Sequence, residues 1–100
     1  MKYKTIKKFN INADKLIHFI DGLKSKKLKL ISISTFIKAD RVIVLKYYIE
    51  KQNQLLIIDA PVKKDQIASL FTYFSNADFI EREISQSFGV KFIGNPNLNI

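Results

Sequence analysis

The central third of the chain constrains the fold most, because it holds three β-prone segments joined by very short connections. These segments are rich in leucine, isoleucine, valine and tyrosine, and they cover residues 28–37, 42–50 and 55–60. Asp40-Arg41 and Gln52-Asn53 are typical of turns between strands. A parallel pairing would need a crossover of about a dozen residues, so the sequence predicts an antiparallel meander. Pro61 has no backbone N–H to donate and is expected to end the third strand.

The N-terminal segment predicts an edge strand and a helix that flank this meander. Residues 3–9 alternate weakly, and their lysines are typical of a strand at the edge of a sheet. Asn12 is suited to the N-cap of a helix that runs to about Lys24. One apolar face of that helix is formed by Leu16, Ile17, Ile20 and Leu23.

The period of the apolar residues becomes helical after the meander. A helix is predicted to begin at Asp65, because Ile67, Leu70, Phe71 and Phe74 recur at helical intervals. Ser75-Asn76 is expected to break it.

A second C-terminal helix is predicted over residues 77–88. Ile80, Ile84 and Phe88 form its apolar stripe, and Gly89 is placed to act as a left-handed C-cap. Residues 90–93 are expected to be extended, and residues 94–96 to form a turn. The predicted fold class is therefore α+β, in one domain that covers residues 1–100. An antiparallel sheet of three to four strands carries an N-terminal helix and C-terminal helices.

Composition argues against several classes of function. The chain has no cysteine and a single histidine, His18, so the usual ligands of zinc, copper and iron–sulfur centres are missing, and we expect no metal or cofactor in this chain. Its three glycines form neither a phosphate-binding loop nor a dinucleotide fingerprint. Glu81 and Glu83 are close in sequence, but two positions apart on a helix they point in different directions, so no catalytic residue is predicted. The apolar runs are too short to cross a bilayer, and the basic N-terminus is not expected to be a secretory signal.

Positive charge is concentrated in the first two thirds of the chain. Residues 1–64 hold 15 Lys/Arg against 5 Asp/Glu, whereas residues 65–100 hold 2 against 4. Such a basic surface suits nucleic acid, anionic lipid or an acidic protein, and a biased genome composition explains it equally well. Tyr3, Tyr47 and Tyr48 keep a small nucleic-acid-binding module as the alternative function. Strand alternation, however, places one of Tyr47 and Tyr48 inward, and no RNP signature accompanies them.

The last quarter of the chain carries a pattern that folding alone does not require. It reads Glu81-Arg82-Glu83, Ile84, Phe88-Gly89, Val90, Phe92 and Gly94-Asn95-Pro96. An amphipathic helix with a glycine cap explains the apolar spacing but not the order of the charged, glycine and proline residues. The segment 77–98 resembles the C-terminal motif of the thirty-kilodalton subunit of NADH:quinone oxidoreductase, which is respiratory complex I. That family also includes small subunits of energy-converting nickel–iron hydrogenases.

The chain departs from this family pattern at four positions. The family usually has Asp before Phe-Gly, where this chain has Gln86, and His-Pro-Asp-Leu-Arg, where it has Asn95-Pro96-Asn97-Leu98-Asn99. Neutral amides thus replace ionisable side chains, which predicts altered partner contacts or a partial loss of the interface. With an end at Ile100, the sequence is expected to resemble the short subunits of energy-converting hydrogenases more than the mitochondrial subunit.

The resemblance implies a non-catalytic subunit of a membrane-associated redox complex of the hydrogenase or NADH:quinone oxidoreductase type. The expected partners are the large catalytic subunit and neighbouring iron–sulfur subunits, in a hetero-oligomer that couples electron transfer to ion translocation. Iron–sulfur clusters, and in the hydrogenases a nickel–iron centre, would lie in those partners. The implied location is the cytoplasmic, inner face of the cell membrane, with only indirect attachment to it.

The signature also supplies the expected partner interface. Glu81, Arg82 and Glu83 are expected to project from the apolar stripe and to form charge-assisted hydrogen bonds with the large subunit. Arg82 is the strongest candidate, because its planar guanidinium group can bind a carboxylate through two hydrogen bonds. The remaining members are expected to fix the path of the chain beneath them: Phe88, Gly89, Phe92, Gly94 and Pro96.

Overall fold

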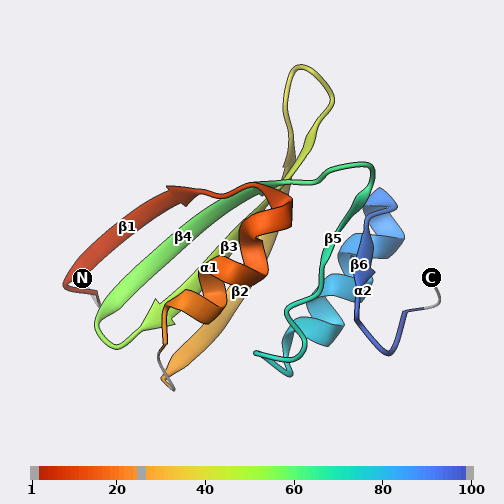
Figure 1. Ribbon diagram of the computed structural model, residues 1–100. Helices are drawn as coiled ribbons and strands as arrows, with labels where there is room; N and C mark the ends of the chain where they lie inside the picture. Colours follow the sequence, from red (N-terminus) through yellow and green to blue (C-terminus); the bar gives the residue numbers. More distant parts are fainter. Residues whose placement is uncertain (1–2, 25–26, 99–100) are drawn as a thin grey trace.

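A four-stranded sheet carries two helices and a small second sheet on one of its faces (Figure 1). This computed structural model describes residues 3–24 and 27–98. The elements in chain order are β1 (Thr5–Asn10), η1 (Ala13–Lys15), α1 (Leu16–Gly22), β2 (Leu28–Ile37), β3 (Ile43–Lys51), β4 (Gln54–Pro61), β5 (Gln66–Ala68), α2 (Ala77–Phe88) and β6 (Lys91–Ile93). The predicted α+β class is confirmed.

The large sheet has the strand order β1-β4-β3-β2. Strands β2, β3 and β4 pair antiparallel, which confirms the predicted meander, and Pro61 is the last residue of β4 as expected. β1 is an edge strand, also as predicted, but it pairs parallel to β4. The chain between β1 and β4 contains α1 and two strands, which is long enough for a parallel pairing.

The core lies between this sheet and the elements on its covered face. Leu45, Tyr47 and Ile49 alternate inward along β3 and are fully buried. Leu16 and Ile20 of α1 pack onto the same cluster, which confirms the predicted helix face. Asn12 precedes the helical segment as expected, but its side chain makes no capping hydrogen bond.

The predicted helix that begins at Asp65 is wrong. Residues 66–68 form β5, which pairs parallel to β6 with Ile67 opposite Phe92. Leu70 and Phe74 are buried through a single turn, in which the Phe74 N–H donates to the Leu70 carbonyl at 2.9 Å. Helical spacing over so short a segment is also satisfied by a strand followed by one turn, and the pairing with distant β6 decides between the two.

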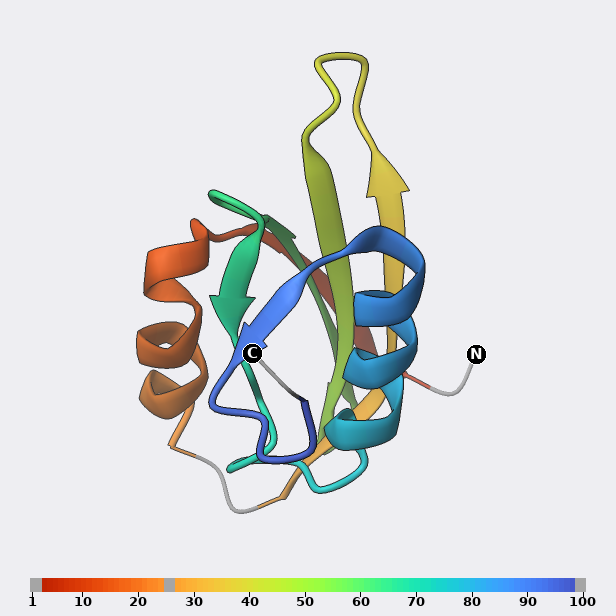
Figure 2. The ribbon, with the colours of Figure 1, turned by 90° about the vertical axis from the view of Figure 1, so that its right-hand side faces the viewer.

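Helix α2 covers residues 77–88, as predicted, and Gly89 ends it. Gly89 has φ +72, the left-handed conformation expected for its position, and its N–H donates to the Ser85 carbonyl at 2.9 Å. Residues 91–93 are extended in β6, and a turn follows at residues 94–97. Both features were predicted. Seen from the side, α2, β6 and this turn lie on the same side of the molecule (Figure 2).

Replacing Gly89 with valine should lower the free energy of unfolding by about 2 kcal/mol, because a side chain with a β-branch is strained at positive φ. Apart from Gly89 itself and its two chain neighbours, no atom lies within 4 Å of the position that a Cβ would occupy, so the loss should come from backbone strain alone. Urea denaturation measures it. Gly22→Ala is the matched control, since Gly22 is helical and also unobstructed, and it should leave stability unchanged or raise it. Equal losses in both variants would count against the strain.

Candidate interaction surface

Glu81 is buried, although the sequence pattern suggested that it projects from α2. Its residue is 0% exposed. It follows Ala77 by four positions and precedes Ile84 by three, so all three share the buried stripe of the helix. The expectation that Glu81 projects from the helix is therefore wrong. The spacing from Ala77 to Ile84 was the signal in the sequence that pointed to this burial.

The Glu81 carboxylate accepts three hydrogen bonds from two other segments of the chain. Ser69 Oγ donates to Oε1 at 2.6 Å, and the Leu70 backbone N–H donates to Oε2 at 2.9 Å. Asn95 Nδ2 donates to Oε1 at 2.9 Å. These bonds tie α2 to the segment after β5 and to the C-terminal turn. Glu81 thus holds the layer of α2, β5 and β6 together, and it cannot contact a partner without leaving this site.

Burial raises the pKa of Glu81 above its ordinary value of 4.5. The hydrogen bonds from Ser69, Leu70 and Asn95 lower the pKa and offset part of this effect, while the charge of Asp78 adds to the rise. The hydroxyl of Tyr47, on the neighbouring sheet, is buried without a hydrogen-bond partner. Burial, and secondarily the charge of Glu81, raise the pKa of Tyr47.

Stability is expected to depend on pH through Glu81. Because the pKa is raised in the folded state, folded protein binds this proton more tightly than unfolded protein does. The part of the stability that comes from binding this proton is therefore fully present below about pH 4.5 and is lost as the pH rises through the raised pKa, while the hydrogen bonds to Ser69, Leu70 and Asn95 contribute separately. Urea denaturation of the natural chain and of Glu81→Gln, across a pH series, should show the natural chain losing stability relative to the variant. A natural chain that instead gains stability over the variant as the pH rises would reverse the assigned direction.

Asp78 joins α2 to the C-terminal turn a second time. Its Oδ1 accepts a hydrogen bond from Arg82 Nε at 3.2 Å, and its Oδ2 accepts one from Asn97 Nδ2 at 2.8 Å. The Asn97 backbone N–H donates in turn to Asn95 Oδ1 at 2.9 Å. Two of the amides that depart from the family pattern are thus used inside the chain. Gln86 is exposed, and Asn99 lies outside the described residues.

The exposed side of α2 carries aromatic and charged side chains together. Phe79 is 60% exposed, and the Arg82 guanidinium carbon lies 5.8 Å from the centroid of its ring. Glu83 is exposed. Phe88 was expected to continue the buried stripe of α2, but it is 40% exposed, so this expectation is wrong. We call these four residues, Phe79, Arg82, Glu83 and Phe88, the C-terminal surface. Phe79 was not among the predicted interface residues, although its position as an aromatic residue off the buried stripe was an available signal.

The other signature residues lie at the C-cap of α2, in β6 and in the turn that follows it. Phe92 is fully buried. Gly89 and Gly94 adopt positive φ angles of 72° and 97°. Pro96 is exposed in the C-terminal turn. The structure thus brings the signature residues together in one layer but separates them into buried and exposed sets.

Features that bear on other functions were also placed by the structure. Tyr47 is buried and Tyr48 is half-buried, as strand alternation predicted, so Tyr47 is not available to stack on bases. His18 is exposed on α1. Among the described residues, no group of three or more His, Cys, Asp and Glu side chains is placed to hold a metal ion. Within the same residues, no helix has both the length and the apolar character needed to cross a bilayer.

Comparison with known proteins gives one family and two similar folds. Residues 9–100 match the family described as respiratory-chain NADH dehydrogenase, 30 kDa subunit. A trypsin-resistant fragment (1–134) of Nqo5 superimposes with a TM-score of 0.76 at 16% identity, over 90% of this chain and 81% of the fragment. A chain of the membrane-bound sulfane sulfur reductase, an archaeal respiratory membrane complex, gives 0.82 at 18% identity over 100% of this chain. This chain spans 64% of that second protein's length. A search of curated proteins finds no match.

Proposed function

The chain belongs to the family of the 30 kDa subunit of respiratory-chain NADH dehydrogenase, and on this basis we propose that it is a non-catalytic subunit of a membrane-associated redox complex. It docks on the large catalytic subunit, in a hetero-oligomer that also contains iron–sulfur subunits. Iron–sulfur clusters, and nickel–iron in a hydrogenase-type complex, belong to those partners. The complex couples electron transfer to ion translocation, and this subunit lies on the inner face of the membrane.

The C-terminal surface is the proposed docking site. The observation that carries this proposal is the exposed pair of Phe79 and Arg82, on a helix that buried Glu81 holds in place. Arginine and aromatic residues are the types most enriched among the residues that dominate protein interfaces. A partner that removes such an exposed aromatic surface from water gains binding free energy from the hydrophobic effect.

The geometry of Arg82 leaves donors for a partner. The Arg82 side chain is 43% exposed, and its ion pair with Asp78 uses Nε. A guanidinium group has five N–H donors, so the two terminal nitrogens remain able to bind a carboxylate of the large subunit. The Phe79 ring and Asp78 hold the guanidinium in one place before binding, which reduces the entropy that binding would cost. Glu83 lies beside Arg82 and suits a basic group of the same partner.

Gentle detergent purification of the tagged chain from its native host tests the proposed function. Mass spectrometry should identify a large subunit of the nickel–iron hydrogenase or NADH:quinone oxidoreductase type together with membrane subunits. A nickel and iron assay of the same sample separates the two kinds of complex. Recovery of the chain alone would oppose the proposal, and recovery of nucleic acid alone would favour the basic surface as the functional site.

A further inference from the structure

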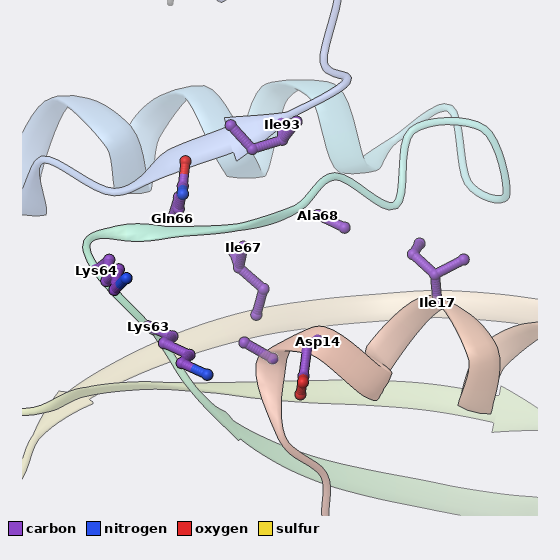
Figure 3. Close-up of a pocket in the computed structure, with 9 residues that line it drawn as sticks. Asp14, Ile17, Lys63, Lys64, Gln66, Ile67, Ala68 and Ile93 are labelled. Carbon is purple, nitrogen blue, oxygen red and sulfur yellow. The ribbon is translucent and has the colours of Figure 1, made fainter.

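A cleft of about 330 Å³ lies between the N-terminal helical segment and β5, apart from the C-terminal surface (Figure 3). Its walls are largely aliphatic and include Ile17 of α1, Ile67 and Ala68 of β5, and Ile93 of β6. Ile93 is 46% exposed. Lys63 and Lys64 lie toward one end of the cleft, and Ile17 lies toward the other (Figure 3). The cleft therefore combines an apolar trough with two positive charges at one end.

The two lysines are held by a strained turn. The Gln66 N–H donates to the Lys63 carbonyl at 3.1 Å, and the Lys63 N–H donates to the Gln66 carbonyl at 3.4 Å. Between them, Lys64 and Asp65 both have positive φ angles, of 54° and 62°. A two-residue turn of this kind strongly favours asparagine and glycine. Local strain of this kind is often found at binding sites, where the surrounding structure maintains it.

A second hollow of about 320 Å³ adjoins the cleft. The two share Ala13, Asp14 and Lys63, and Asn12 adds a polar side chain to the second one. Lys63 thus stands where an apolar trough meets a more polar hollow. Asp14 lines both hollows and adds one carboxylate to them. Among the described residues, no carboxylate forms an ion pair with either lysine.

The backbone of β5 argues against an added peptide strand as the occupant. The N–H of Ser69 and the carbonyl of Asp65 bond to β6, so the alternation of the strand turns the backbone groups of Gln66 away from β6. Those groups of Gln66 are already bonded to Lys63. Strand addition needs a row of free backbone groups at such an edge, and among the residues of β5 only Ala68 still turns an N–H and a carbonyl outward without such a bond. The cleft is better matched to a ligand that brings an apolar chain and no backbone of its own.

We propose that this cleft binds an anionic amphiphile, in which a carboxylate or phosphate head group is attached to an unbranched apolar chain. The apolar chain of the ligand lies along Ile17, Ile67 and Ile93, and its head group contacts Lys63 and Lys64. The volume is at the lower end of the range of about 300–1,000 Å³ for small-molecule sites, so it takes a short chain or part of a long one. A free fatty acid and a membrane phospholipid share this chemistry.

Nuclear magnetic resonance titration of the full chain with decanoate, below its micelle-forming concentration, tests the site. Saturable shifts are expected at the amides of Ile17, Ala68 and Ile93. Decanol and decylammonium, which lack the negative charge, should bind more weakly. The double variant Lys63→Gln and Lys64→Gln should weaken decanoate binding by up to about tenfold, the range expected for two exposed ion pairs.

Two variants that alter the apolar trough show whether the apolar chain of the ligand occupies it. Ala68→Phe fills the cleft and should abolish the shifts. Ile93→Gln, at an exposed position, provides a second variant if Ala68→Phe does not fold. Vesicles of anionic phosphatidylglycerol, with vesicles of phosphatidylcholine as the control, distinguish a membrane phospholipid from a free fatty acid as the ligand. Binding to the anionic vesicles that Ala68→Phe abolishes identifies a phospholipid, whereas binding of decanoate alone identifies a free acyl anion. The proposal would be overturned if decanoate gave no saturable shifts, or if decanol and decylammonium bound as tightly as decanoate.

Discussion

Replacing Glu81 with alanine is expected to lower the free energy of unfolding by about 3 kcal/mol. The substitution leaves the Ser69 hydroxyl, the Leu70 N–H and the Asn95 amide without their buried acceptor. Each stranded donor costs about 1–3 kcal/mol, and release of the buried carboxylate from its desolvation penalty offsets part of the sum. Urea denaturation at neutral pH measures the change.

Glu83→Ala is the matched control for this experiment. Glu83 is exposed on the same helix, so its loss should change stability by no more than about 0.5 kcal/mol. Hydrogen exchange of the Leu70 amide should accelerate in Glu81→Ala and remain slow in the control, because that amide donates directly to Glu81. If the two variants lose the same stability, Glu81 does not hold the layer together.

Replacing Arg82 with alanine is expected to weaken association with the large subunit by about 2–5 kcal/mol, because a partner carboxylate would be left buried and unpaired. The isolated chain should hardly change. Its intrachain pair with Asp78 is partly exposed and spans four positions on one helix, a type that contributes about 0.3–0.5 kcal/mol. The measurement is the yield of co-purified large subunit, beside a denaturation curve of the free chain.

Lys29→Ala controls for the loss of a positive charge elsewhere. Lys29 is exposed on β2 and lies outside the C-terminal surface, so co-purification should be retained. Phe79→Ala should behave like Arg82→Ala, since the ring supports the guanidinium group and is itself exposed. An unchanged yield with Arg82→Ala would remove Arg82 from the interface.

Much of the fold could be predicted because its signals are local. The short turns of the meander determine the antiparallel pairing, and Gly89 marks the end of α2 wherever that helix packs. The segment after Pro61 could not be predicted in the same way. Its strand exists because Ile67 meets Phe92, a residue far along the chain, and helical spacing carries no information about that contact.

The candidate site was predicted only in outline. The signature indicated the correct segment, but it did not show that Glu81 faces inward while Arg82 faces outward. Glu81 is buried because Ser69, Leu70 and Asn95 supply donors to it, and two of these belong to a segment that the sequence predicted to be helical. The prediction that relied on the charge of Glu81 therefore placed this residue on the wrong side of the helix. The cleft beside β5 was also missed, because its lining comes from three separate segments of the chain, within residues 13–17, within residues 63–68 and at Ile93.

Site-specific photo-cross-linking in the native host shows whether the C-terminal surface docks on a large redox subunit. A photoreactive amino acid is placed at position 79 in one strain and at position 34 in another. Ser34 is an exposed residue of β2 whose side chain faces away from the core and from α2. We expect position 79 to cross-link to the large subunit of a hydrogenase-type or NADH:quinone oxidoreductase-type complex, and we expect no such cross-link from position 34. Cross-links to that subunit from position 34 alone, or from neither position, would contradict this expectation.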